Sequence, residues 1–180
     1  MKKLIVVING RGGVGKDTLC DVVGQRFNTF NVSSITPIKE IAWELGWDNV
    51  KDEKGRKFLS DLKAVTMEYN PDFFIDYLIE KVKTFYLSDD SVMFVHIREI
   101  DQINKFELAV QKLGTLNNEI TVKDLLVRRS AIDMNVYGNI SDDNVFNYQY
   151  DYWYDNETKL EKVDEAFSKW FDTHLLQFII

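Results

Sequence analysis

Nine residues near the start of the chain have the types and the spacing needed to bind a phosphate. The segment Gly10-Arg-Gly-Gly-Val-Gly-Lys-Asp-Thr18 follows an apolar run and precedes apolar residues at helical spacing. Glycines let the backbone curl so that successive N–H groups point at one anion, and the first turn of a helix adds its unpaired donors. A lysine at position 16 adds a positive charge for the β- and γ-phosphates of a nucleotide. The sequence therefore predicts a phosphate-binding loop that consists of Gly10, Gly12, Gly13, Val14, Gly15, Lys16, Asp17 and Thr18.

The same glycines also fit a dinucleotide-binding turn, through Gly10, Gly12 and Gly15. That site needs an acidic residue about 20 residues further on to bind the ribose hydroxyls. After Asp21, however, the next acidic residue is Glu40, beyond the second expected strand. A lysine directly after the last glycine also has no role in a dinucleotide site, so we favour the nucleoside triphosphate loop.

Position 17 departs from the usual loop, in which a Ser or Thr follows the lysine and binds Mg²⁺. Here Asp17 follows Lys16, and Thr18 comes one residue later. A carboxylate beside a polyphosphate is repelled unless a cation lies between them, so either Asp17 binds Mg²⁺ directly or through water, or the site binds nucleotide poorly. We predict the first. The cofactors expected are thus ATP and Mg²⁺. In the alternative interpretation, Asp17 only favours the helix N-terminus electrostatically.

A buried parallel sheet must position this loop. The run Leu4–Ile8 is continuously apolar and rich in β-branched residues, which is typical of a strand buried on both faces. Strands are also expected at 30–34, 91–97, 122–127 and 148–154, and the stretches between them have helical periodicity. Asn70-Pro71 and the capping box Thr158–Glu161 are each expected to open a helix. This alternation predicts an α/β fold, a three-layer α/β/α P-loop nucleoside triphosphate hydrolase fold with a mainly parallel sheet.

Composition limits the other possibilities. The 180 residues include 22 Lys and Arg against 29 Asp and Glu, a net charge of −7 that opposes nucleic acid as a main partner. One cysteine, Cys20, and two histidines provide neither a disulfide framework nor a Cys/His zinc site. The apolar run near the N-terminus is too short for a signal peptide or a membrane span, so we expect a cytoplasmic protein without a membrane partner.

The sequence gives no indication of oligomeric state. We expect a single domain over residues 1–180, with a lid in residues 128–144.

Several motifs together resemble a known family. Besides the Gly-Lys-Asp-Thr loop, they are Ser34–Ala42 with its Pro-x-Lys step, Tyr69–Phe74, Val95–Glu99 and Tyr150–Asn156. In these segments the chain resembles the P-loop small-molecule kinases, a group that includes phage and bacterial deoxynucleoside monophosphate kinases and the animal-type phosphomevalonate kinase. The likeness covers nearly the whole chain, although the loop itself is specific only to the wider superfamily.

The resemblance implies roles for residues outside the loop. ATP would bind at residues 10–18 and an acceptor phosphate on the opposite side, where Lys39 and Arg98 would contact the acceptor or the transferred phosphate. Arg128 and Arg129 stand where a lid would begin and could reach the migrating phosphoryl group. Asp155 and Asn156 match a loop near the nucleotide base. The implied catalytic residues are Lys16, Arg98, Arg128 and Arg129.

One family feature is missing from this sequence. Many relatives have an Asp two residues before the strand-end arginine, where this chain has His96. A neutral imidazole is a poor Mg²⁺ ligand, so metal assistance would depend on Asp17, helped by Glu99 or water. His96 could also be a buried structural histidine. The leading hypothesis is an ATP-dependent phosphotransferase that acts on a small phosphorylated acceptor, a (deoxy)nucleoside monophosphate. The alternatives are another acceptor, such as phosphomevalonate, and a nucleotide-binding regulatory module with weak catalysis.

Overall fold

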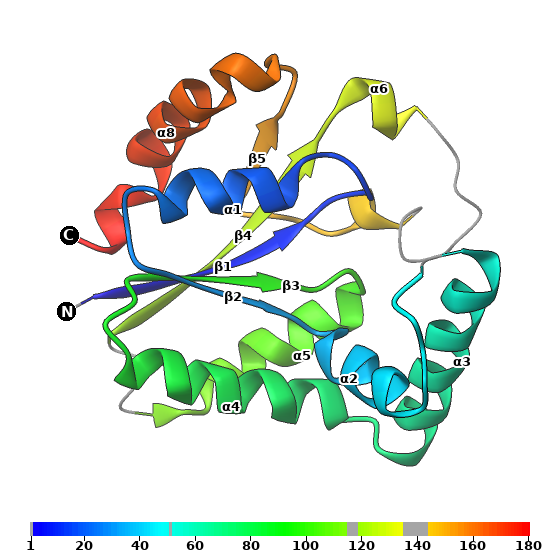
Figure 1. Ribbon diagram of the computed structural model, residues 1–180. Coiled ribbons are helices and arrows are strands. Elements are labelled where there is room, and N and C mark those ends of the chain that lie inside the picture. Colours follow the sequence, from blue (N-terminus) through cyan, green and yellow to red (C-terminus); the bar gives the residue numbers. More distant parts are fainter. Residues whose placement is uncertain (1, 51, 115–118, 135–143) are drawn as a thin grey trace.

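The centre of the protein is a five-stranded sheet in the order β2-β3-β1-β4-β5, in which all neighbouring strands are parallel (Figure 1). A computed structural model describes residues 2–50, 52–114, 119–134 and 144–180. The central strand is buried along its whole length, as its continuous apolar sequence predicts. The strands are β1 (Lys3–Asn9), β2 (Thr29–Ser33), β3 (Val92–His96), β4 (Ile120–Arg128) and β5 (Tyr152–Asp155).

Helices connect these strands and cover both faces of the sheet. They are α1 (Lys16–Gly24), α2 (Thr36–Glu44), α3 (Glu53–Tyr69), α4 (Phe73–Leu87), α5 (Ile100–Gln111), α6 (Ser130–Asp133) and α8 (Val163–His174), with 3₁₀ turns η2 (Val145–Asn147), η3 (Leu160–Lys162) and η4 (Leu176–Phe178). Within the described residues, no helix is long and apolar enough to cross a membrane.

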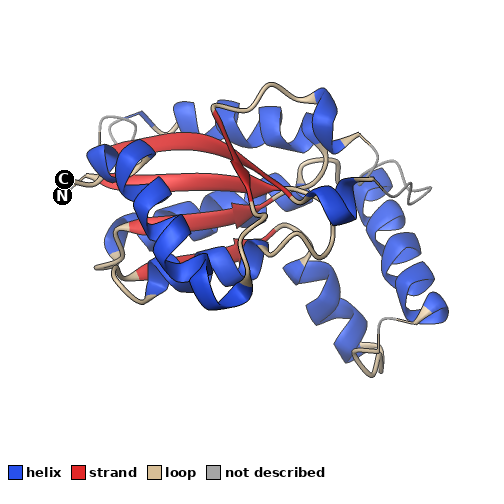
Figure 2. Cartoon of the chain, turned by 90° about the horizontal axis from the view of Figure 1, so that it is seen from above, coloured by secondary structure: helices blue, strands red, loops and turns tan. Residues whose placement is uncertain are grey.

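The two faces of β1 contribute to two separate cores. Leu4, Val6 and Ile8 pack with α1 and α8, whereas Ile5 and Val7 pack with α4 and α5. This division follows from the alternation of side chains along a strand. Seen from above in Figure 2, helices lie on both sides of the strands. The expected three-layer α/β/α fold is therefore confirmed.

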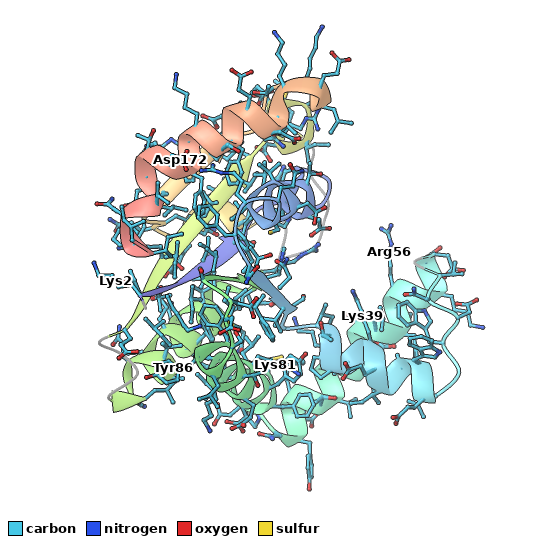
Figure 3. All side chains as sticks on the ribbon, turned by 60° about the vertical axis from the view of Figure 1, so that its left-hand side comes forward. Lys2, Lys39, Arg56, Lys81, Tyr86 and Asp172 are labelled. Carbon is cyan, nitrogen blue, oxygen red and sulfur yellow. The ribbon has the colours of Figure 1, made fainter. Side chains whose placement is uncertain are left out.

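Helices α2 and α3 form an arm that packs less closely on the sheet. They contact each other and lie beyond the carboxyl ends of β1 and β3 (Figure 1). The side chain of Asp52 caps α3 by accepting a hydrogen bond from Gly55 N–H at 2.7 Å. Lys39 on α2 and Arg56 on α3 belong to this α2–α3 arm, which stands apart from the sheet layers in Figure 3.

The expected strand over residues 148–154 is wrong in its first half. Of this segment only Tyr152–Asp155, which form β5, pair with β4, beginning where Tyr152 stands opposite Leu125. Tyr148 and Tyr150 precede the strand and pack in the core on the α4–α5 side, whereas Tyr152 packs in the other core. The segment with the alternating tyrosines thus passes from one side of the sheet to the other before it pairs with β4.

Both predicted helix starts are also wrong. Helix α4 begins at Phe73, because Asn70 ends α3 and uses its side-chain oxygen to accept a hydrogen bond from Asp72 N–H at 3.2 Å. The capping box that starts at Thr158 does not open α8, since the turn η3 comes first and α8 begins at Val163. In each case the side chain that was expected to cap a helix lies in the connection before it.

Candidate functional site

The predicted loop connects β1 to α1 and needs glycine at three positions. Gly10, Gly13 and Gly15 have φ angles of +139°, +86° and +96°, in the region that favours glycine. An ideal Cβ on Gly15 would lie 2.5 Å from Nδ2 of Asn156, so this position also lacks space for a side chain. The loop therefore turns sharply and lies close against its neighbours.

Lys16 is the first residue of α1, and its side chain lies over the loop. Its Nζ donates hydrogen bonds to the carbonyl oxygens of Gly10, at 2.6 Å, and Arg11, at 2.9 Å. Asp17 follows in the first helical turn, and its side chain is exposed. The ammonium group thus stands at the side of the loop where a phosphate would bind.

Two contacts from later parts of the chain hold the loop. Asn156 is buried, and its Nδ2 donates to the Val14 carbonyl oxygen at 2.8 Å. Arg11 is also buried, and its guanidinium donates to the carbonyl oxygen of Asp133 in α6 at 2.6 Å. The same guanidinium lies 5.2 Å from the ring centre of Phe146. The sequence analysis missed Arg11, because its partners, a distant carbonyl and a ring, leave no local pattern.

A partly buried histidine ends the strand next to β1. His96 is the last residue of β3, whose carboxyl end lies beside that of β1. Burial lowers the pKa of His96, and the Asp17 carboxylate opposes this shift. The positive charges of Lys16, Arg98 and Lys39 lower the pKa further. Because the carboxyl ends of β1, β2 and β3 lie side by side, the phosphate-binding loop, Lys39 on α2 and Arg98 all follow the same edge of the sheet.

Cys20 lies against this histidine and is part of the core. Its Sγ is 3.8 Å from Nε2 of His96, and only 2% of the residue is exposed. Burial raises the pKa of the thiol above its usual range. Cys20 is therefore a small core residue, and its thiol is not activated as a nucleophile.

The predicted lid arginines lie at the edge of the site. Arg128 forms a two-point ion pair with Asp155, at 2.7 and 2.8 Å, and its guanidinium lies 5.9 Å from the ring centre of Trp153. Arg129 precedes α6, and its backbone N–H donates to Oδ2 of Asp133 at 2.7 Å. The structure thus pairs Arg128 with Asp155 across β4 and β5. The rest of the expected lid, residues 135–143, lies outside the described residues.

The residues at the loop fit a magnesium site of the kind found in nucleotide enzymes. Mg²⁺ is usually held by one or two carboxylates together with substrate phosphates and water, rather than by a complete protein cage. Within the described residues, no group of three or more His, Cys, Asp and Glu side chains could hold a metal. The exposed carboxylate of Asp17 beside the loop therefore matches this donor set, whereas His96 offers a nitrogen that Mg²⁺ does not favour.

A central parallel strand, a glycine loop with left-handed positions and a helix that starts at a lysine together define the P-loop class of α/β proteins. No protein-family model and no curated protein matches this chain. Two solved structures share the fold along almost all of its length. The tunicamycin resistance protein of Deinococcus radiodurans has a TM-score of 0.55 and 13% identity, covering 94% of this chain and 95% of that one. A protein of Chloroflexus aurantiacus, described as a candidate kinase, has a TM-score of 0.50 and 15% identity, covering 98% and 97%.

At this level of identity the two likenesses establish the fold alone. Neither protein is named as a deoxynucleoside monophosphate kinase or a phosphomevalonate kinase. The more specific resemblance therefore remains a hypothesis about the acceptor.

Proposed function

We propose that this protein is an ATP-dependent phosphotransferase that moves the γ-phosphate of ATP to a small phosphorylated acceptor, a (deoxy)nucleoside monophosphate. The observation behind this proposal is that charged residues follow the carboxyl ends of three adjacent parallel strands. Lys16 and Asp17 follow β1, Lys39 lies on α2 after β2, and Arg98 follows β3. Two anionic substrates that must meet need such an arrangement, because cations have to neutralise both of them.

Phosphoryl transfer suits this set of residues. The reaction needs positioning and charge neutralisation, and it needs no covalent intermediate with the protein. Lys16 would bind the β- and γ-phosphates, and Asp17 would hold Mg²⁺, which supplies positive charge on the phosphate oxygens when bound. Lys39 and Arg98 would bind the acceptor phosphate. Arg129 would add charge from the start of the lid, and Asp155 and Asn156 would lie near the base.

The proposal is tested by measuring ADP formation with a panel of ribo- and deoxynucleoside monophosphates and phosphomevalonate. We expect at least one nucleoside monophosphate to stimulate turnover. Arg98→Ala should lower turnover by about 100-fold or more while ATP affinity stays unchanged, since it removes a donor that acts on the transferred charge. Lys16→Ala should weaken ATP binding about 10- to 100-fold, the range expected for a lost hydrogen bond to a charged group.

The matched control is Lys169→Ala, which removes a positive charge from an exposed position on α8. It should leave both turnover and ATP affinity unchanged. If ADP formation responds to phosphomevalonate and to none of the nucleotides, the assignment of the acceptor is wrong. If ATP binds but no acceptor stimulates turnover, the phosphotransferase itself is wrong.

A second candidate function is a nucleotide-binding regulatory module. The observation that favours it is His96 at the carboxyl end of β3, a nitrogen ligand at the position where the kinases that the sequence resembles have an Asp. Such a module would bind ATP through Lys16 without transferring phosphate. Arg98→Ala separates the two functions. In a regulatory module it would leave ATP affinity unchanged and would have no phosphate transfer to lower, whereas in the phosphotransferase it would lower turnover.

A further inference from the structure

The segment that follows β3 and contains Arg98 is held from two sides. On one side is Asn9, the last residue of β1, which is 1% exposed. Its Oδ1 accepts a hydrogen bond from Gly10 N–H at 2.8 Å. Its Nδ2 donates to the Arg98 carbonyl oxygen at 3.2 Å and to the Tyr150 hydroxyl at 2.9 Å. One buried amide therefore bonds both to the start of the phosphate-binding loop and to the backbone of Arg98.

On the other side, the α2–α3 arm reaches the next residue of this segment. Lys63 of α3 forms an ion pair with the carboxylate of Glu99, directly after Arg98. Its ammonium also lies 5.7 Å from the ring centre of Phe74, at the start of α4. Lys63 thus lies where α3, α4 and the segment after β3 meet.

The burial of this ion pair distinguishes it from a surface contact. The side chains of Lys63 and Glu99 are 22% and 24% exposed, whereas those of the Lys57–Asp61 pair on the same helix are 74% and 61% exposed. Exposed pairs contribute little to structure, because water and salt screen them. A partly buried pair restricts its two elements more strongly, since breaking it leaves a charge in a poorly solvated place.

Arg98 therefore stands between two fixed points. Asn9 sets its backbone relative to the phosphate-binding loop, and the Lys63–Glu99 pair sets the same segment relative to the arm that bears Lys39. A shift of either contact would change the distance of Arg98 from the donor phosphate of ATP or from the acceptor phosphate of the proposed reaction. Misplacement by about 1 Å can cost roughly 100-fold in rate when two reactants must be aligned.

We propose that Asn9 and the Lys63–Glu99 ion pair are positioning residues that align the acceptor side of the site with the phosphate-binding loop. They act through Arg98 and the arm, and they do not touch the reacting atoms. This inference rests on the proposed phosphotransferase function. It adds that the spacing between donor and acceptor depends on contacts made by Asn9 and Lys63, two residues outside the recognised motifs.

Lys63→Met and Lys57→Met form a matched pair of variants on one helix. With whichever nucleoside monophosphate proves active, Lys63→Met should lower kcat/KM for the acceptor about 10- to 100-fold, while ATP affinity stays unchanged. Lys57→Met should change neither quantity. The reversed pair, Lys63→Glu with Glu99→Lys, should restore most of the loss, which would show that the ion pair itself is needed; a purely structural defect would lower ATP affinity together with kcat/KM. An unchanged kcat/KM in Lys63→Met would overturn the role of this pair.

Asn9→Ser tests the other contact. Serine keeps an oxygen that can accept from Gly10 N–H and adds no charge beside the phosphates, but its shorter side chain removes the amide donor to the Arg98 carbonyl oxygen. We expect kcat/KM for the acceptor to fall about tenfold or more while ATP affinity is retained. Equal losses of acceptor turnover and ATP affinity would show that Asn9 supports only the loop, against the proposal.

A measurement that needs no acceptor separates this proposal from the proposed function. Hydrogen exchange of the amides in α3 and residues 97–99 should be faster in Lys63→Met than in Lys57→Met, because the contact between these segments is lost. If the wild-type protein transfers no phosphate, the phosphotransferase fails, but the exchange experiment still decides whether the ion pair fixes the arm. Equal exchange in the two variants would contradict that role.

Discussion

At the scale of single residues, Gly10 shows how the end of one strand constrains the loop. Its φ is +139°, and an ideal Cβ would lie 2.3 Å from the carbonyl oxygen of Val127 on β4. That atom belongs to the backbone, so it cannot move aside as a flexible side chain can. Gly12, two residues later, has no atom within 4 Å of an ideal Cβ. The two glycines of one motif therefore have different structural requirements.

This difference predicts unequal effects of the same substitution. Gly10→Ala should lower the free energy of unfolding by about 1–3 kcal/mol, because it adds both backbone strain and a clash. Gly12→Ala should change it by less than about 0.5 kcal/mol, as expected for an open surface position. Urea unfolding at constant pH measures both values. Equal values for the two variants would show that the contact with Val127 does not constrain the loop.

The residues of the site differ in how well the sequence predicts them. The glycines and Lys16 have a local pattern, since the spacing itself defines the loop. Arg11 and Asn156 could not be assigned in this way, because each holds the loop through a backbone carbonyl group far away in sequence. The ion pair between Arg128 and Asp155 depends on the pairing of β4 with β5, which fixes which residues stand opposite each other.

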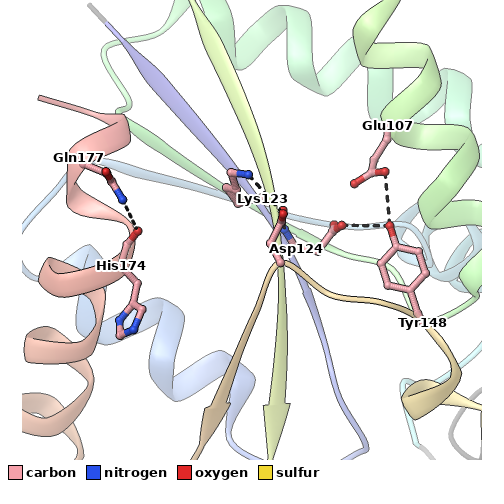
Figure 4. A network of polar contacts seen from close by, with 7 residues as sticks. Glu107, Lys123, Asp124, Tyr148, His174 and Gln177 are labelled. Carbon is pink, nitrogen blue, oxygen red and sulfur yellow. Dashed lines mark hydrogen bonds and ion pairs between the residues drawn. The ribbon is translucent and has the colours of Figure 1, made fainter.

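At the scale of secondary-structure elements, a polar network joins β4, α5 and the segment before β5. Asp124 is 4% exposed and accepts a hydrogen bond from the Tyr148 hydroxyl at 3.0 Å (Figure 4). That hydroxyl is also 3.4 Å from the carboxylate of Glu107 on α5. Burial raises the pKa of Asp124 to about 8, and Glu107 contributes to the increase, whereas the bond from Tyr148 opposes it. Three elements thus meet at a carboxyl group whose raised pKa favours the protonated form at neutral pH.

This pKa predicts how stability depends on pH. An unfolded aspartate has a pKa of about 3.9, so between roughly pH 4 and pH 8 the folded state binds more protons at Asp124. The free energy of unfolding should therefore fall as pH rises through this window, by up to about 1.4 kcal/mol per pH unit for one proton. In Asp124→Asn this contribution is absent, so the variant should gain stability relative to wild type between pH 5 and pH 8.

Urea unfolding of both proteins at several pH values in this window measures the effect. The exposed Asp61 provides the control, since Asp61→Asn should follow the pH dependence of wild type. If the curves for Asp124→Asn and wild type are parallel, Asp124 is ionised in the folded protein throughout the window.

The elements were predicted well where one periodicity continues to the end of the segment. β1 and β3 are continuous apolar runs that are buried on both faces, and α5 has one apolar face that is buried. The segment before β5 could not be predicted from its alternating tyrosines, since Tyr148 and Tyr152 pack in opposite cores. The start of α4 was misplaced because an asparagine side chain can accept a backbone hydrogen bond either as a helix cap or in the turn between two helices, and Asn70 does the second.

At the scale of the whole molecule, the C-terminal helix α8 covers one side of α1, the helix that follows the phosphate-binding loop. α8 packs on α1, and Phe171 of α8 is fully buried, with its ring centre 5.8 Å from that of Phe27, which lies just after α1. Leu175 after α8 is also fully buried in the same core. The helix that begins at Lys16 therefore depends on residues more than a hundred positions away, and its stability is a property of the complete chain.

This dependence predicts that a core residue of α8 affects nucleotide binding without touching the nucleotide. Phe171→Ala should lower the free energy of unfolding by about 3–5 kcal/mol, the range for removing a buried aromatic side chain. Leu160→Ala, at a 77% exposed position, is the control and should change it by less than about 0.5 kcal/mol. If Phe171 supports α1, saturating ATP should raise the thermal midpoint of Phe171→Ala less than that of wild type, because part of the binding energy is used to order the loop and the first helix. An equal rise in both proteins would mean that the loop and α1 keep their structure without this contact, and that α8 stabilises the fold independently of the phosphate-binding site.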